Sequence, residues 1–163
     1  MELRDELDNL KKMWWLHDSY WHATAVRELG ATLANKLNLE ANEQFFRKYT
    51  LMLLKSGQIS KPHNIVELIV IFRKIWANCF FEEMYIHEPI SVQGNEATWI
   101  GQKCNAFASL QAGNMTDGYA CGCQALRNGV MKALRLEPAH SIVESLVNGN
   151  ERCVIKFSFI PKQ

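Results

Sequence analysis

The stretch "AHSIVESLVNGNERCVIKFSFI", residues 139–160, decides the fold class. Two runs rich in β-branched and aromatic residues flank Asn148-Gly149-Asn150, and Asn-Gly supplies the positive φ angles of a tight turn. The stretch therefore predicts an antiparallel β-hairpin. Alternation along its second strand places Cys153, Ile155 and Phe157 on one face, which predicts that Cys153 packs in the core.

A second hairpin is expected earlier in the chain. The segments "FFEEMYIHEP" (80–89) and "ATWIGQKC" (97–104) alternate between apolar and polar residues, and the turn-forming Gln93-Gly94-Asn95 lies between them. Two short helices are predicted between the hairpins, over 105–112 and 118–135.

The first half of the chain has helical periodicity. Apolar residues recur at intervals of three and four, which favours helices. Gly30 interrupts the helical pattern, Gly57 ends a helix, and Pro62 lies in the first turn of the next one. The predicted helices span 3–29, 39–57 and 60–78, and residues 31–38 form a separate or kinked helical piece. The fold class is therefore α+β: a helical N-terminal half (1–80), followed by a small antiparallel sheet of two hairpins with a helical insertion (81–163), in a single domain over 1–163.

Composition limits the function. A chain of 163 residues that is 48% hydrophobic and 21% charged can fold as one domain around its own core. A net charge of +1 without a Lys/Arg block argues against a nucleic-acid partner. The opening "MELRDELDNLKK" does not resemble a secretory signal, and no apolar run approaches the roughly 20 residues of a membrane span, so we expect a cytoplasmic protein without a membrane partner. Five reduced cysteines can then serve packing, metal binding or catalysis.

The segment "TDGYACGCQALRNG", residues 116–129, separates two cysteines by one residue. If the helix covers 118–135, Cys121 lies in its first turn, where free N–H groups and the helix dipole lower a thiol pKa. Cys121 is then either a nucleophile or a packed side chain. Cys123 would point about 200° away and is most simply a small buried hydrophobe. The two thiols would converge, as on a metal, only if this segment is not helical.

Histidine and tryptophan are concentrated in the helix over 3–29. His17 lies on the apolar stripe between Trp14 and Trp21, so we expect it to point inward, whereas His22 diverges from it by about 140°. His17 is either a core residue or a proton carrier, and the two tryptophans can form the wall of a pocket for a small planar ligand. A metal site from Cys104, Cys121, Cys123 and His17 is the alternative use of these side chains, with zinc or iron as the ion, although no CxxC pair is present.

From Cys104 onward the sequence resembles a known family. A strand that ends in Cys104, a short helix, Cys121 opening a second helix, and the closing pattern Glu144-x-Leu-x-x-Gly-x-x-x-Cys153-x-x-x-Phe157 are similar to the L-2-amino-thiazoline-4-carboxylic acid hydrolase family and its bacterial relatives. The closing hairpin also resembles 4-vinyl-reductase-type ligand-binding domains. The resemblance covers about 60 residues, and it implies an enzyme that opens a C–N bond of a small ring by adding water.

Three functions are therefore open. The first is a hydrolase of a cyclic amidine or amide, without a cofactor or with a zinc or iron ion, in which Cys121, Cys104 and His17 act on a substrate held by Trp14, Trp21 and Tyr119. The second is a sensor or carrier that binds a small ligand, haem or a metal in the same pocket without turnover. The third is a partner-binding protein, including a homodimer, that uses the tryptophan-rich helix around Trp15.

Overall fold

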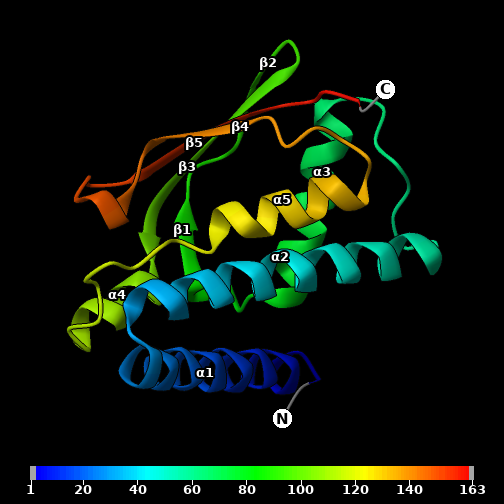
Figure 1. The fold of residues 1–163 in the computed structure, drawn as a ribbon. Coiled ribbons are helices and arrows are strands. Elements are labelled where there is room, and N and C mark those ends of the chain that lie inside the picture. The colour runs from blue at the N-terminus through cyan, green and yellow to red at the C-terminus, as the bar shows by residue number, and fades with distance from the viewer. Residues whose placement is uncertain (1–2, 162–163) are drawn as a thin grey trace.

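The computed structural model describes residues 3–161, and it confirms the α+β class. Helices α1 (Leu3–Leu29), α2 (Ala31–Lys55) and α3 (Ile65–Cys79) come first, and a five-stranded antiparallel sheet follows. Figure 1 shows the sheet at the top, α5 (Cys123–Ala133) beneath it, then α2, and α1 at the bottom, while α3 runs nearly upright behind α5 and α2.

The long strand β3 organises the sheet. The strands are β1 (Tyr85–His87), β2 (Ser91–Gln93), β3 (Glu96–Cys104), β4 (His140–Glu144) and β5 (Cys153–Ser158). The order along the sheet is β1-β3-β5-β4, and β2 also pairs with β3. All the strand pairs are antiparallel, as the two predicted turn regions require.

The connections of both hairpins differ from the predicted turns. Gly94, with φ 58°, turns the chain from the short strand β2 into β3, whereas β1 pairs with the far end of β3. Between β4 and β5 a 3-10 turn, Leu146–Asn148, precedes Gly149 with φ 85°, so the loop is longer than a two-residue turn.

One face of the sheet meets the helices. The register pairs Ala97 with Phe157, Trp99 with Ile155, and Gly101 with Cys153, and these six residues share that face. Against it pack buried side chains of α3 and α5, including Leu68, Ile75, Leu126, Val130 and Met131. The predicted inward phase of Cys153, Ile155 and Phe157 is therefore confirmed.

Two helix boundaries differ from the prediction. α2 runs without a break from Ala31 to Lys55, so the separate piece over 31–38 is wrong. α3 begins at Ile65, because the Asn64 side chain accepts a hydrogen bond from the Glu67 N–H at 2.9 Å and caps the helix there.

The segment before α5 is not helical, so the predicted helix over 118–135 begins too early. α4 (Asn105–Ala112) ends as predicted, but α5 starts only at Cys123. The buried Asn35 of α2 holds the intervening loop: its amide donates to the Gly118 carbonyl at 2.5 Å and accepts from the Ala120 N–H at 3.3 Å. These two bonds hold the non-helical loop before Cys121 against α2.

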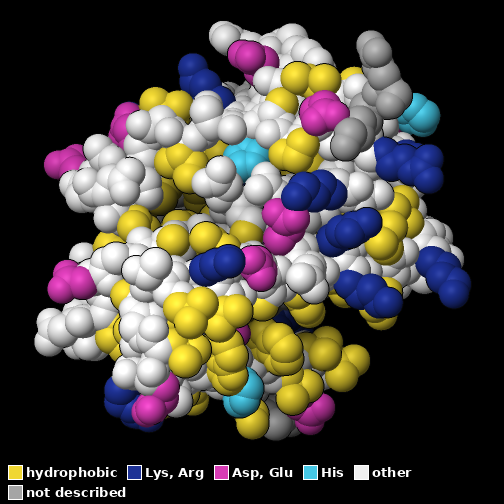
Figure 2. Space-filling model, in the orientation of Figure 1, with side chains coloured by type: hydrophobic (Ala, Val, Ile, Leu, Met, Phe, Trp, Pro, Cys, Tyr) yellow, Lys and Arg dark blue, Asp and Glu magenta, His cyan; other side chains and the backbone are white. Residues whose placement is uncertain are grey.

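The packed face of α1 is rotated by roughly 80° from the one predicted. Leu3, Leu7, Leu10, Trp14 and Trp21 are each about half exposed or more, and His17 is exposed. Figure 2 shows hydrophobic side chains gathered over α1 and α2 at the bottom of the view. The inward face of α1 carries Trp15, Asp18, His22 and Ala25 instead. In residues 3–161 no helix combines the length and apolar character needed to cross a bilayer.

Candidate functional site

A largely apolar cavity of about 90 Å³ lies between α1, α4, α5 and the sheet, and four cysteines line it. We call it the cysteine pocket, after Cys104, Cys121, Cys123 and Cys153. All four are free thiols with partial exposure. The remaining wall includes the aromatic side chains of Trp15, Phe80, Tyr85, Trp99, Phe107 and Tyr119.

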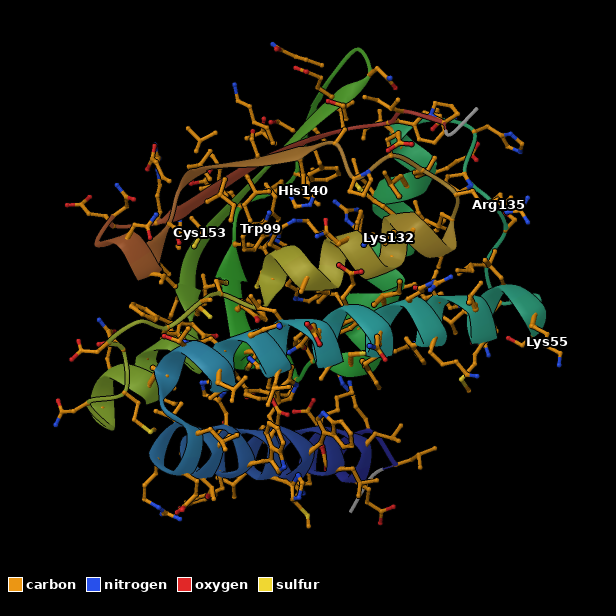
Figure 3. All side chains as sticks on the ribbon, viewed as in Figure 1. Lys55, Trp99, Lys132, Arg135, His140 and Cys153 are labelled. Atoms are coloured by element: carbon orange, nitrogen blue, oxygen red, sulfur yellow. The ribbon has the colours of Figure 1, made fainter. Side chains whose placement is uncertain are left out.

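Sheet register brings distant cysteines to this pocket. Cys104 ends β3 opposite Tyr85 of β1, and Cys153 begins β5 opposite Gly101 of β3. The Leu146 N–H donates to the Cys153 sulfur at 3.4 Å, which fixes that thiol at the mouth of the β4–β5 loop. Figure 3 places Cys153 and Trp99 in the layer between the strands and α5.

Cys121 and Cys123 act as a pair, contrary to the divergence predicted for a continuous helix. Because α5 begins at Cys123, Cys121 still belongs to the loop before the helix, and the two thiols share a hydrogen bond. Gly122 between them lies against the Asn42 side chain, where a Cβ would be 3.5 Å from the amide nitrogen. The alternative of a non-helical segment, left open by the sequence, is the one that the structure adopts.

The activated thiol is Cys123 rather than Cys121. The hydrogen bond from Cys121 lowers the pKa of Cys123 to about 6, against the opposing effect of burial, and the charge of Arg127 and the Tyr85 hydroxyl, 3.8 Å from the sulfur, lower it further. The same shared hydrogen bond and burial raise the pKa of Cys121 well above its ordinary value. Cys123 is also the first residue of α5, where the helix dipole favours a thiolate.

The other groups around Cys123 stay protonated. Burial, with a smaller contribution from Cys123, raises the pKa of Cys104 to about 11, although the N–H groups of Ala106 and Phe107 oppose this rise. Burial also raises the pKa of both Tyr85 and Tyr119. At neutral pH these groups are therefore neutral donors that surround one thiolate.

α1 contributes Asp18 and His22 to the cysteine pocket. His22 is only 6% exposed, its ring meets Tyr119 edge-on at 6.0 Å, and its Nδ1 is buried without a hydrogen-bond partner. Burial lowers its pKa, and the neighbouring Asp18 partly offsets this effect. Burial raises the pKa of Asp18 in turn. His22 is therefore a neutral imidazole at pH 7.

Three of the predicted site residues lie elsewhere. His17, Trp14 and Trp21 line a groove between α1 and α2 and do not reach the cysteine pocket. Trp14 stacks on Phe45 of α2 at 6.0 Å. The expectation that His17 points inward is wrong, because the stripe that contains it lies at the edge of the packed face of α1 and His17 is exposed there. Tyr119, Cys104 and Cys121, by contrast, are brought together.

Sequence reasoning missed Arg127. It is 5% exposed, it lies on the face of α5 toward the sheet, and its Nε and Nη2 have no hydrogen-bond partner. Burial lowers the pKa of Arg127, whereas the neighbouring acidic groups of Cys123, Cys121, Cys153 and Tyr85 act to raise it. A single Arg among the core-facing positions of an amphipathic helix was the available signal.

His140, at the start of β4, lies partly buried on the side of the sheet toward α5 (Figure 3). Its Nε2 is 2.7 Å from the Asn128 side-chain oxygen. Burial first, and then the charge of Arg127, lower its pKa to about 4. His140 is thus neutral at physiological pH.

The predicted metal site is not formed. Over residues 3–161 no three His, Cys, Asp or Glu side chains are grouped so that they could hold a metal ion. Cys104, Cys121 and Cys123 share the cysteine pocket, but His17 is on the outer side of α1.

Comparison with known proteins adds no family assignment: neither a model of a known protein family nor a curated protein matches the chain.

Proposed function

We propose that the protein is a cysteine-dependent enzyme that adds water across a C–N bond of a small cyclic amidine or amide, with Cys123 as its nucleophile. The observation that carries this proposal is the Cys123 thiol at the start of α5, which faces an aromatic-walled cavity and has a pKa of about 6. The cyclic substrate rests on the sequence resemblance to the amino-thiazoline carboxylic acid hydrolases.

The reaction divides into two steps. The Cys123 thiolate attacks the substrate carbon to form a C–S bond, and the ring C–N bond breaks as its nitrogen takes a proton from a neutral donor. A water molecule then attacks the same carbon and the C–S bond breaks, which regenerates the thiolate. His22 is our candidate for accepting the proton of this water, because its lowered pKa keeps it neutral.

Donors for the developing charge surround Cys123. Tyr85 and Tyr119 keep their hydroxyl protons, and the first N–H groups of α5 have no carbonyl partner within the helix. Fixed donors of this kind stabilise a charged intermediate more strongly than water does, because they need no reorganisation during the reaction.

The proposal is tested by intact-mass spectrometry of the protein with a panel of cyclic amidines and thiazolines, together with detection of ring-opened product. We expect product and a transient adduct in the wild type, neither in Cys123→Ser, and both in the matched variant Cys79→Ser, whose thiol does not line the cysteine pocket. Turnover that survives Cys123→Ser contradicts the proposal.

Ligand binding without turnover is the second candidate, and the size of the cavity favours it. An apolar cavity of about 150 Å³ is what holds benzene, so the 90 Å³ cysteine pocket must widen for a substituted ring but takes a smaller ligand as it stands. An adduct on Cys123 that accumulates without product would select this candidate.

Partner binding through α1, including a homodimer, is supported by the exposed stripe of Leu7, Leu10, Trp14 and Trp21. Trp15 is not part of this surface: its Nε1 donates to the Cys79 carbonyl at 3.0 Å and its ring stacks on Phe80. Light scattering should give a dimer mass that falls to the monomer in a Trp14→Ser, Trp21→Ser variant. A monomer in the wild type contradicts homodimer formation.

A further inference from the structure

A second cavity, of about 260 Å³, lies between α3 and the sheet. We call it the indole pocket, because the rings of Trp76 and Trp99 form part of its wall, 6.0 Å apart. Its other walls are apolar, with Phe72, Ile90, Ile155 and Phe157. Trp99, Ile155 and Arg127 also line the cysteine pocket, so the two cavities are neighbours.

Arg127 brings an unsatisfied cation to the indole pocket. The buried Nε and Nη2 without partners form one edge of the guanidinium, and their N–H bonds run parallel, which matches the two oxygens of a carboxylate. Arg152 shows this pairing in the same molecule: its Nε and Nη2 donate to the two oxygens of Glu144 at 2.9 and 3.2 Å. At Arg127, which is 5% exposed, no carboxylate occupies this edge, and the Cys123 thiolate acts on the guanidinium only through its charge.

Trp76 adds a second unsatisfied donor. Its Nε1 is buried and has no hydrogen-bond partner, and an indole N–H can only donate. Stacking on Phe80 at 4.7 Å and an edge contact with Tyr85 at 5.1 Å fix the ring. Trp76 lines the indole pocket but not the cysteine pocket, so only the indole pocket contains both unsatisfied donors.

The charges around the indole pocket also favour an anion. Among the described residues that line it there is no Asp or Glu, and the exposed Arg73 and His87 lie at its rim. Buried guanidinium N–H groups without hydrogen-bond acceptors are costly to fold, so a bound acceptor group stabilises this arrangement.

We propose that the indole pocket binds a small carboxylic acid with an apolar, aryl-sized body. Its carboxylate lies on the Nε–Nη2 edge of Arg127 and accepts a further hydrogen bond from Trp76, while its body fills the space between the aromatic walls. The cavity is larger than the roughly 150 Å³ that accommodates benzene, so a phenylalkanoate fits in size. This site does not depend on the chemistry proposed for Cys123.

Calorimetric titration with 3-phenylpropanoate, and with its neutral amide as the matched ligand, tests the proposal. We expect the acid to bind at least tenfold more tightly than the amide. In a nitrogen–proton correlation spectrum, the indole N–H signal of Trp76, assigned by its loss in Trp76→Phe, should move on binding. The signal of Trp15, whose N–H is already bonded to Cys79, should stay in place.

Variants locate the ligand. Trp76→Phe keeps the ring and should weaken binding about 3- to 10-fold, and Arg127→Met should weaken it about 10- to 100-fold and remove the preference for the acid. Cys104→Ser should leave the affinity within about twofold, because its side chain lines only the cysteine pocket. No binding of the acid, equal affinity for acid and amide, or an affinity that changes with Cys104→Ser but not with Trp76→Phe would each overturn the proposal.

Discussion

α1 and α5 are both amphipathic helices in the sequence, but they contribute to the fold very differently. α1 spans 27 residues, of which only His22 and Ala25 are buried, whereas α5 spans 11 residues with seven buried. α5 lies between the sheet and α2, so it has neighbours on two sides, and α1 has α2 and the end of α3 on one side only. The comparison teaches that the most apolar face of a helix need not be its buried face. Each helix has a buried polar side chain at a candidate site: His22 of α1 lines the cysteine pocket, and Arg127 of α5 lines both the cysteine pocket and the indole pocket.

The largest effect is expected where α5 meets α2. A Cβ at Gly129 would overlap the Glu43 carbonyl oxygen and the Arg47 nitrogen, which belong to the backbone of α2 and cannot move aside cheaply. We expect Gly129→Val to lower the free energy of unfolding by about 3 kcal/mol or more. Urea denaturation measures this loss.

The matched change on α1 is Leu10→Ala, at a side chain that is 60% exposed. It should alter stability by less than about 0.5 kcal/mol. If Leu10→Ala costs as much as Gly129→Val, then the outer face of α1 is buried in solution and the contrast between the two helices fails.

The next effect is a gain. Arg127 is buried without a carboxylate, and replacing such a charge by an apolar side chain of similar length is often stabilising by about 1–4 kcal/mol. We expect Arg127→Met to raise the free energy of unfolding by about 1–2 kcal/mol in the absence of ligand, and Arg152→Met, at the exposed bidentate pair, to lower it slightly. A clear loss of stability in Arg127→Met would mean that Arg127 already has a partner that stabilises the fold.

A smaller effect concerns pH. The folded-state pKa of His140 is lowered from 6.5 to about 4, so between these values the unfolded chain binds more protons than the folded one. The contribution of His140 is therefore fully present above about pH 6.5 and is lost as the pH falls toward 4. His140→Asn should flatten the decline of stability across this window by about 1 kcal/mol, allowing for partial exposure.

The exposed His63 provides the control for that titration. His63→Asn should leave the decline unchanged. Equal pH profiles for the wild type and His140→Asn would show that His140 titrates normally in the folded protein.

The sequence was sufficient for the fold class, because periodicity and turn residues report local structure directly. It predicted the extent of α1, the position of α4 and both turn regions around Gly94 and Gly149. It could not show which face of α1 is buried, since that depends on the contacts of Trp15 with Cys79 and Phe80, more than 60 positions away.

The candidate site was predicted only in part for the same reason. The cysteine pair converges because Asn35 holds the loop before α5, and a contact across 83 positions leaves no local signal. Cys104, Cys121 and Tyr119 were identified from their types and positions. Arg127 and His140 were missed because a lone polar residue in an amphipathic segment is usually at the surface.

The most direct test of the central claim is the pH dependence of Cys123 alkylation by iodoacetamide, followed by peptide mass mapping of all five cysteines. The account predicts that Cys123 reacts with a midpoint near pH 6, well below the ordinary thiol value of about 8.5, and that Cys79 and Cys104, with pKa values of about 11, remain largely unmodified at pH 7. A Cys123 midpoint at 8.5 or above, or preferential modification of Cys121, would contradict it.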